Sequence, residues 1–258
     1  MQRSVARTVE RVTERVTERT ANRTEDHVLN RVAPGLFATA LTVARKDIVI
    51  ELRSRSVILS ALSFTVLGIT IFFFAWDPTA VASVDLAPGV LWVIFTFSGL
   101  LGLHRSFGVE QQTRAIDALL AAPVDREGIY LGKMLANLVF VLLIQVVALP
   151  AVALLYNVPI GAYLASLAGI VLLASLGLVS VGTLFSAMAV NTRLAELLLP
   201  LLALPFFVPV ILPAAQATGR LMSGRAVSEV AAYIQLLAAF DIVFLIVCTL
   251  AYPYTLED

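Results

Sequence analysis

The stretch "MLANLVFVLLIQVVALPAVALLY", Met134 to Tyr156, decides the class of this fold because it contains no charged side chain. A helix of about 20 apolar residues is long enough to cross the hydrocarbon layer of a bilayer. The whole chain has the same character, since 59% of its 258 residues are hydrophobic, 14% are charged and the mean hydropathy is +0.91. A soluble chain of this length could not hide that much apolar surface. The sequence therefore belongs to an integral membrane protein.

Five further runs resemble this one. They are continuously apolar and rich in Leu and Ala, whereas the strands of a membrane barrel alternate in segments of about ten residues. The sequence predicts an all-α integral membrane fold with six transmembrane helices. The predicted spans are residues 57–76, 87–103, 134–156, 162–189, 197–217 and 230–252.

Two polar segments precede the first span. Residues 1–34 are predicted to be a charged N-terminal tail, partly disordered, because their valine stripe covers only two heptads; a short coiled coil or surface helix is the alternative. Residues 35–258 form the predicted transmembrane domain. It begins with a predicted amphipathic helix at the membrane interface, or alternatively a cytoplasmic helix packed on a partner. The apolar face of this helix holds Phe37, Leu41, Ala44, Ile48 and Leu52.

The distribution of Lys and Arg predicts the orientation, because cytoplasmic loops of membrane proteins are enriched in these residues. The loops on one side carry nine, namely Arg45, Lys46, Arg53, Arg55, Arg105, Arg114, Arg126, Lys133 and Arg193. The loops on the other side carry two, Arg220 and Arg225. We therefore expect a multi-pass protein with both termini in the cytoplasm. We further expect its membrane to be the plasma (inner) membrane.

The connector "VEQQTRAIDALLAAPVDREGIYLGK", Val109 to Lys133, is unusually long and polar for a link between two spans. A helix over its first half would end before Pro123, and Asp125 could cap a second helix that runs into the third span. This pattern predicts a cytoplasmic helix, a tight turn and a return to the membrane. Such an element suits docking to a soluble partner, although a solvated connector is the simpler alternative.

Polar and helix-breaking residues also occur inside the predicted spans. Asp241 and Gln145 each lie eleven residues into a span, and buried polar groups at such depth face protein or water. We predict either a structural hydrogen bond between them or a place on a substrate or proton pathway. The fifth span must bend or break, because each proline removes a backbone hydrogen-bond donor. The bent segment either lines a path or is kinked without a mechanistic role. Its prolines are Pro200, Pro205, Pro209 and Pro213.

The sequence offers no set of catalytic residues. It lacks the His-Glu-x-x-His pattern of zinc enzymes and the Gly-x-Ser-x-Gly pattern of hydrolases. The stretch "GIYLGKM", Gly128 to Met134, resembles a phosphate-binding loop, but its spacing is one residue short and Met134 replaces the hydroxyl residue. We therefore expect no metal site and no enzyme activity, and any use of ATP would need a separate subunit.

Two stretches of the chain resemble a known family. "LAPGVLWVIFTFSGLLGLHRSFGVEQQTRAIDALLAAPVDREGIYLGK", Leu86 to Lys133, is similar to the signature region of the CcmB, or heme exporter protein B, family, and "LLLPLLALPFFVPVILPAAQA", Leu197 to Ala217, is similar to its proline-rich fifth span. This ABC-2 permease family implies six helices, a membrane-surface helix and a coupling helix that docks on an ATPase subunit. The implied coupling residues are Glu110, Arg114, Asp117, Leu119, Leu120, Pro123, Asp125 and Arg126.

The resemblance further implies a permease subunit of a heteromeric ABC complex for cytochrome c maturation. Its partners would be the ATPase, a heme-handling membrane subunit and a small membrane subunit, and two copies of the chain could form a homodimer. ATP would bind to the partner, heme would be the transported or delivered ligand, and no cofactor or nucleic acid would bind this chain directly. An ABC-2 permease for a drug, lipid or glycan and a non-transporting membrane scaffold are the alternatives.

Overall fold

The structure, a computed structural model, describes residues 35–113, 125–158, 160–189 and 195–256. Within these ranges, six helices are long and apolar enough to cross a membrane. The predicted all-α membrane class and its six spans are confirmed. The predicted charged tail, residues 1–34, lies outside the described residues.

The described chain is helical along most of its length. Its helices are α2 (Leu36–Ser54), α3 (Ser56–Ala75), α4 (Ser83–Thr113), α6 (Arg126–Leu155), α7 (Leu164–Ala189), α8 (Ala195–Met222) and α9 (Val227–Ala251), with short 3-10 turns η1 (Gly161–Tyr163) and η2 (Tyr252–Leu256). Several helices extend beyond their predicted spans, most of all α4, which continues to Thr113, and α6, which already begins at Arg126. Hydropathy marks only the apolar part of a helix, whereas Glu, Gln and Arg also favour helical backbone.

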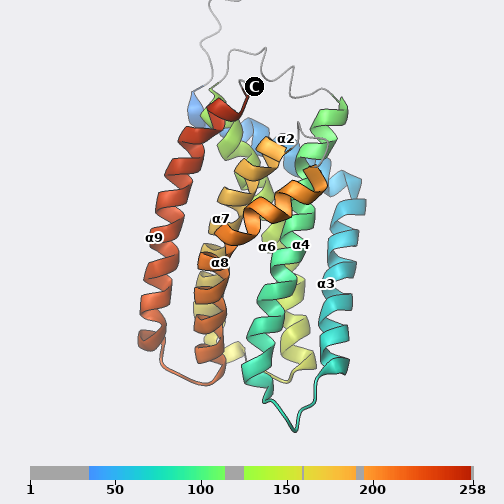
Figure 1. The fold of residues 1–258 in the computed structure, drawn as a ribbon, viewed down its shortest axis with the longest axis vertical. Helices are drawn as coiled ribbons and strands as arrows, with labels where there is room; N and C mark the ends of the chain where they lie inside the picture. Colours follow the sequence, from blue (N-terminus) through green and yellow to red (C-terminus); the bar gives the residue numbers. More distant parts are fainter. Residues whose placement is uncertain (1–34, 114–124, 159, 190–194, 257–258) are drawn as a thin grey trace, which may run out of the picture. The chain divides into compact units, whose positions relative to one another are not determined.

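Helix α2 lies across one end of the bundle, and the spans run between this end and the opposite one (Figure 1). A single residue, Arg55, separates α2 from α3 and has a positive φ of 47°. That conformation is uncommon for a residue with a side chain, and it lets the chain turn sharply from the surface helix into the first span.

At the opposite end, a short turn joins α3 to α4. Asp77 accepts hydrogen bonds from the backbone nitrogen of Thr79 at 2.9 Å and from its hydroxyl at 2.7 Å. These bonds lower the pKa of the Asp77 carboxyl because they stabilise its charged form.

Polar side chains link neighbouring spans inside the bundle. The hydroxyls of Thr65 in α3 and Ser98 in α4 lie 2.7 Å apart, and the indole of Trp92 in α4 donates to Thr218 in α8 at 3.0 Å. All four residues are buried. A polar group in an apolar medium needs such a partner, so these bonds specify which helices are neighbours.

Helix α8 is one continuous helix that changes direction along its length (Figure 1). Pro213 is buried, while Pro205 and Pro209 are exposed on the bundle surface. Pro200 also belongs to α8, but its side chain is outside the described set. The helix therefore bends without breaking, and the mechanistic role of its prolines stays a prediction.

The surface helix α2 has two different faces. Phe37 and Leu41 are 85% and 69% exposed, as an interfacial helix requires of side chains that face lipid. Ala44 was predicted on the same apolar face, but it is buried together with Ala40 and Val43. The reason is that α2 is not isolated at the interface, because its small residues pack directly on α6.

Candidate functional site

The predicted coupling connector lies partly inside the described chain. Glu110 belongs to α4, although its side chain is outside the described set, and Asp125 occupies the N-cap position of α6. Arg126 is the first residue of that helix. The remaining coupling residues, Arg114, Asp117, Leu119, Leu120 and Pro123, lie outside the described residues. The described end of the connector, residues 125–133, forms the N-cap and the first turns of α6.

Two glycines of α6 allow α2 to approach its backbone. A side-chain carbon built on Gly132 would lie 2.6 Å from both the carbonyl oxygen of Ala40 and the Cβ atom of Val43. One built on Gly128 would lie 2.9 Å from the Cβ atom of Thr39. Contacts this short leave no room for a methyl group, so the two glycines create the surface on which α2 rests. Helices in membranes commonly approach one another over such a pair spaced by four residues.

These glycines belong to the stretch that resembles a phosphate loop. The structure gives them a packing role, which sequence reasoning missed. The signal was present, since Gly128 and Gly132 form a Gly-x-x-x-Gly pattern at the start of a span. The pattern indicates a close helix contact but does not name the partner helix.

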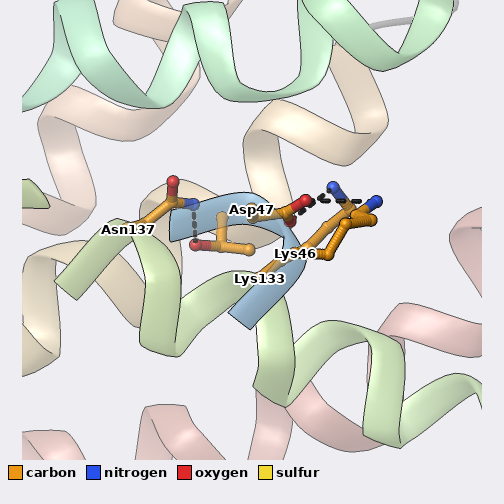
Figure 2. A network of polar contacts seen from close by, with 5 residues as sticks. Lys46, Asp47, Lys133 and Asn137 are labelled. Carbon is orange, nitrogen blue, oxygen red and sulfur yellow. Dashed lines mark hydrogen bonds and ion pairs between the residues drawn. The ribbon is translucent and has the colours of Figure 1, made fainter. Parts of the chain in front are cut away.

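A charge cluster around the buried Lys133 strengthens the same contact. Lys133 of α6 is 1% exposed, and its ammonium group lies 3.4 Å from a carboxylate oxygen of Asp47 in α2. The other oxygen of Asp47 lies 3.1 Å from the ammonium group of Lys46. Figure 2 shows the Asp47 carboxylate joined by dashed lines to the ammonium groups of both lysines. A buried ammonium ion is costly without a nearby anion, so Asp47 specifies where α2 sits along α6.

The same part of α6 is also bonded to α7. The Tyr130 hydroxyl donates to the backbone oxygen of Ser180 at 3.0 Å, and the Asn137 amide donates to the Thr183 hydroxyl at 3.0 Å (Figure 2). Ser180 and Thr183 lie three residues apart on α7, so both bonds reach one side of that helix.

The end of the chain forms a further contact with α6. A guanidinium nitrogen of Arg126 lies 3.5 Å from the backbone oxygen of Pro253 and donates to it. The rings of Tyr130 and Tyr252 lie 5.4 Å apart. We call the described contacts of residues 125–137 with α2, α7 and η2 the α6 junction. Because one helix start holds three elements, a displacement there would move all three.

The predicted hydrogen bond between Asp241 and Gln145 is wrong. Both side chains are buried, but neither has a hydrogen-bond partner among the residues that the structure describes. Asp241 faces α7 instead, since a Cβ atom on Gly177 would lie 2.6 Å from a carboxylate oxygen of Asp241 and 3.1 Å from a methyl group of Val210. Equal depth in two spans does not make their residues face each other, because depth says nothing about rotation around the helix axis.

The described residues contain no group of three His, Cys, Asp or Glu side chains that could hold a metal ion. Cys248 is buried in α9, and within the described ranges it forms no disulfide. The polar contacts of the site connect α6 to α2 and α7.

Fold and junction together define a multi-pass α-helical membrane protein in which a surface helix is fixed to the helix that follows a long polar connector. The sequence model of the family described as CcmB protein matches residues 38–258 of this chain. The chain belongs to the CcmB family.

Individual relatives agree with this assignment. Heme exporter protein B of Rhodobacter capsulatus is 33% identical over 166 residues, which cover 64% of this chain and 76% of the relative. Heme exporter protein B of Paracoccus denitrificans is 34% identical over 164 residues, covering 64% and 75%. The protein of the same name from Haemophilus influenzae is 28% identical over 172 residues, covering 67% and 77%.

Proposed function

We propose that the chain is the membrane permease subunit of a heteromeric ABC transporter for cytochrome c maturation, in which it serves heme export or heme delivery. Membership of the CcmB family is the observation that carries this proposal, and relatives named heme exporter protein B support the substrate. ATP is bound and hydrolysed by a separate subunit. A heme-handling membrane subunit and a small membrane subunit complete the complex.

The α6 junction is the part of the chain that would receive motion from the ATPase. The connector holds the expected coupling residues, and two of them, Asp125 and Arg126, are the N-cap and the first residue of α6. A displacement of this helix start moves α2 through Gly128 and Gly132, and moves α7 through Tyr130. Packed helices transmit small shifts as rigid units, so the junction suits a coupling role.

The proposed orientation places this junction in or near the cytoplasm of a cell with an inner membrane. The excess of Lys and Arg at the α2 end supports cytoplasmic termini. The turn at Asp77 and the loop between α8 and α9 then lie on the extracytoplasmic side, where cytochromes c are assembled.

Asp241 and Gln145 are proposed as polar points of a pathway through the chain. Both are at least 97% buried and lack hydrogen bonds within the described residues. Buried polar groups without partners are costly, and they persist where a ligand or another conformation satisfies them. Replacing Asp241 with Ala would then reduce cytochrome c formation while leaving the ATPase bound.

The proposal is tested by purifying the tagged chain from its native membrane in mild detergent and identifying the proteins that co-elute. We expect an ATPase together with a heme-handling membrane protein. Co-elution of an ATPase alone would support the permease assignment but would favour a drug, lipid or glycan as the substrate. The absence of any ATPase would favour a membrane scaffold.

A pair of variants tests the connector itself. Leu119→Asp and Leu120→Asp should remove the ATPase from the purified complex, because a charged side chain cannot fill an apolar docking pocket. Leu119→Met keeps the apolar character and serves as the matched control. Membrane insertion should be equal in all three, and unchanged ATPase recovery with the Asp variants would contradict the coupling role.

A further inference from the structure

A pocket of about 440 Å³ lies between the start of α4 and the end of α8. These helix ends lie at the end of the bundle opposite α2 (Figure 1). The pocket is outside the α6 junction, and the proposed coupling function makes no use of it. Its lining combines charged groups, Asp85, Arg220 and Arg225, with the apolar side chains of Val84, Pro88 and Ala215.

The two arginines of the pocket differ in their availability for a ligand. Arg225 forms an ion pair with Glu229 at 3.1 Å. The guanidinium group of Arg220 lies 5.0 Å from the ring centre of Tyr233, and within the described part of the chain it forms no ion pair. A guanidinium group held over an aromatic ring still has N–H groups that can bind an anion, because the ring does not accept them as a carboxylate would.

The pocket also contains a negative charge that is not neutralised by the arginines. Asp85 is exposed in the first turn of α4, and no hydrogen bond or ion pair of its carboxylate exists with the residues that the structure describes. Two opposite charges therefore line one cavity without contacting each other. A ligand that carries both an anionic and a cationic group would complement them.

The position of the pocket selects the class of that ligand. Asp85 is in the first turn of the α4 span and Arg220 is in the last turn of the α8 span, so the charges lie at the membrane boundary. Pro88 and Ala215 lie about one turn deeper along the same helices, on the side of the hydrocarbon layer. The helices are close there, since a Cβ atom on Gly219 would lie 3.5 Å from Pro88. A charged rim above an apolar wall fits an amphiphile.

We propose that this pocket binds the headgroup of a zwitterionic phospholipid, with the phosphate at Arg220 and the ammonium group at Asp85. Phosphatidylethanolamine has both groups. Phosphatidylglycerol has the phosphate but carries an uncharged glycerol in place of the ammonium group. The two lipids therefore test the two charges separately.

Native mass spectrometry of the delipidated full-length chain, with the two lipids added at matched acyl length, measures this binding. We expect stronger retention of phosphatidylethanolamine than of phosphatidylglycerol. Arg220→Gln should weaken the binding of both about tenfold, because it removes a charge-assisted hydrogen bond to phosphate. Asp85→Asn should abolish the preference for phosphatidylethanolamine, because it removes the partner of the ammonium group and also the carboxylate that repels the anionic phosphatidylglycerol.

Matched controls make the same charge changes elsewhere. Arg53→Gln removes an exposed cation from α2, and Asp77→Asn removes a carboxylate from the turn at the same end as the pocket. Both should bind the lipids like the unaltered chain. If Arg220→Gln lowers the thermal unfolding midpoint, Arg220→Lys is used in its place. This variant should show an intermediate loss of lipid binding, because it keeps the positive charge but not the planar guanidinium group.

Two results would overturn the proposal. The first is equal binding of both lipids by the unaltered chain, by Arg220→Gln and by Asp85→Asn. The second is displacement of bound phosphatidylethanolamine by equimolar heme. That result would assign the pocket to heme, whose two carboxylate groups would bind there in place of a lipid headgroup.

Discussion

Two glycines allow a close helix contact at the α6 junction. Gly128 and Gly132 place the backbone of α6 against Thr39, Ala40 and Val43 of α2. In lipid, this close approach favours association because apolar surface alone gives little advantage over contact with lipid tails.

Gly132→Ala should lower the free energy of unfolding by about 1–3 kcal/mol, because the added methyl group collides with the backbone of α2. Gly169→Ala in α7 is the control, since nothing lies within 4 Å of the added carbon. It should be neutral, or stabilising by up to about 1 kcal/mol. Thermal unfolding in detergent compares the two variants, and equal midpoints would contradict the packing role of Gly132.

Asp47 carries the charge that holds two lysines at the same junction. Asp47→Asn should cost about 1.5–3 kcal/mol, because the buried Lys133 then loses a charged partner. Lys46→Met should cost less than about 1 kcal/mol, since the Lys46 side chain is 37% exposed and its charge is solvated. The order of the thermal unfolding midpoints checks this, and a greater loss with Lys46→Met would reverse the assignment.

At the scale of elements, hydropathy and helix propensity account for much of what could be predicted. Six apolar runs gave six spans, and the amphipathic pattern before them gave α2. The pattern could not show that α2 packs on α6, because Ala44 is apolar enough for lipid and small enough for a close helix contact. The prediction of a hydrogen bond between Asp241 and Gln145 was wrong for a related reason, because a sequence gives the depth of a residue in the membrane but not the rotation of its helix.

The bent helix α8 is the element whose role is most open to a direct test. Pro205 and Pro209 face outward, so replacing them with Ala restores backbone donors without disturbing the core. If the bend serves transport, Pro205→Ala and Pro209→Ala should lower the yield of c-type cytochromes in cells while the ATPase still co-purifies. Full yield with both variants would favour the scaffold alternative.

At the scale of the whole molecule, charge distribution predicts the orientation of every loop. Cys248 is buried, so the chain provides a low background for labelling of introduced cysteines. Arg53→Cys should react with an impermeant maleimide only after the cytoplasmic side is opened, and Asp77→Cys should react in intact spheroplasts. Reaction of both positions from one side would contradict the proposed orientation.

The turn at Arg55 has a mechanical consequence. Because a single residue joins α2 to α3, the link has no spare length in which a displacement of α2 could be absorbed. A displacement of the start of α6 is therefore passed to α2, and from α2 through Arg55 to the first span, α3. Inserting a few glycines after Arg55 would make this link flexible. The first span, α3, would then no longer follow a displacement of α2, although both helices would be unaltered.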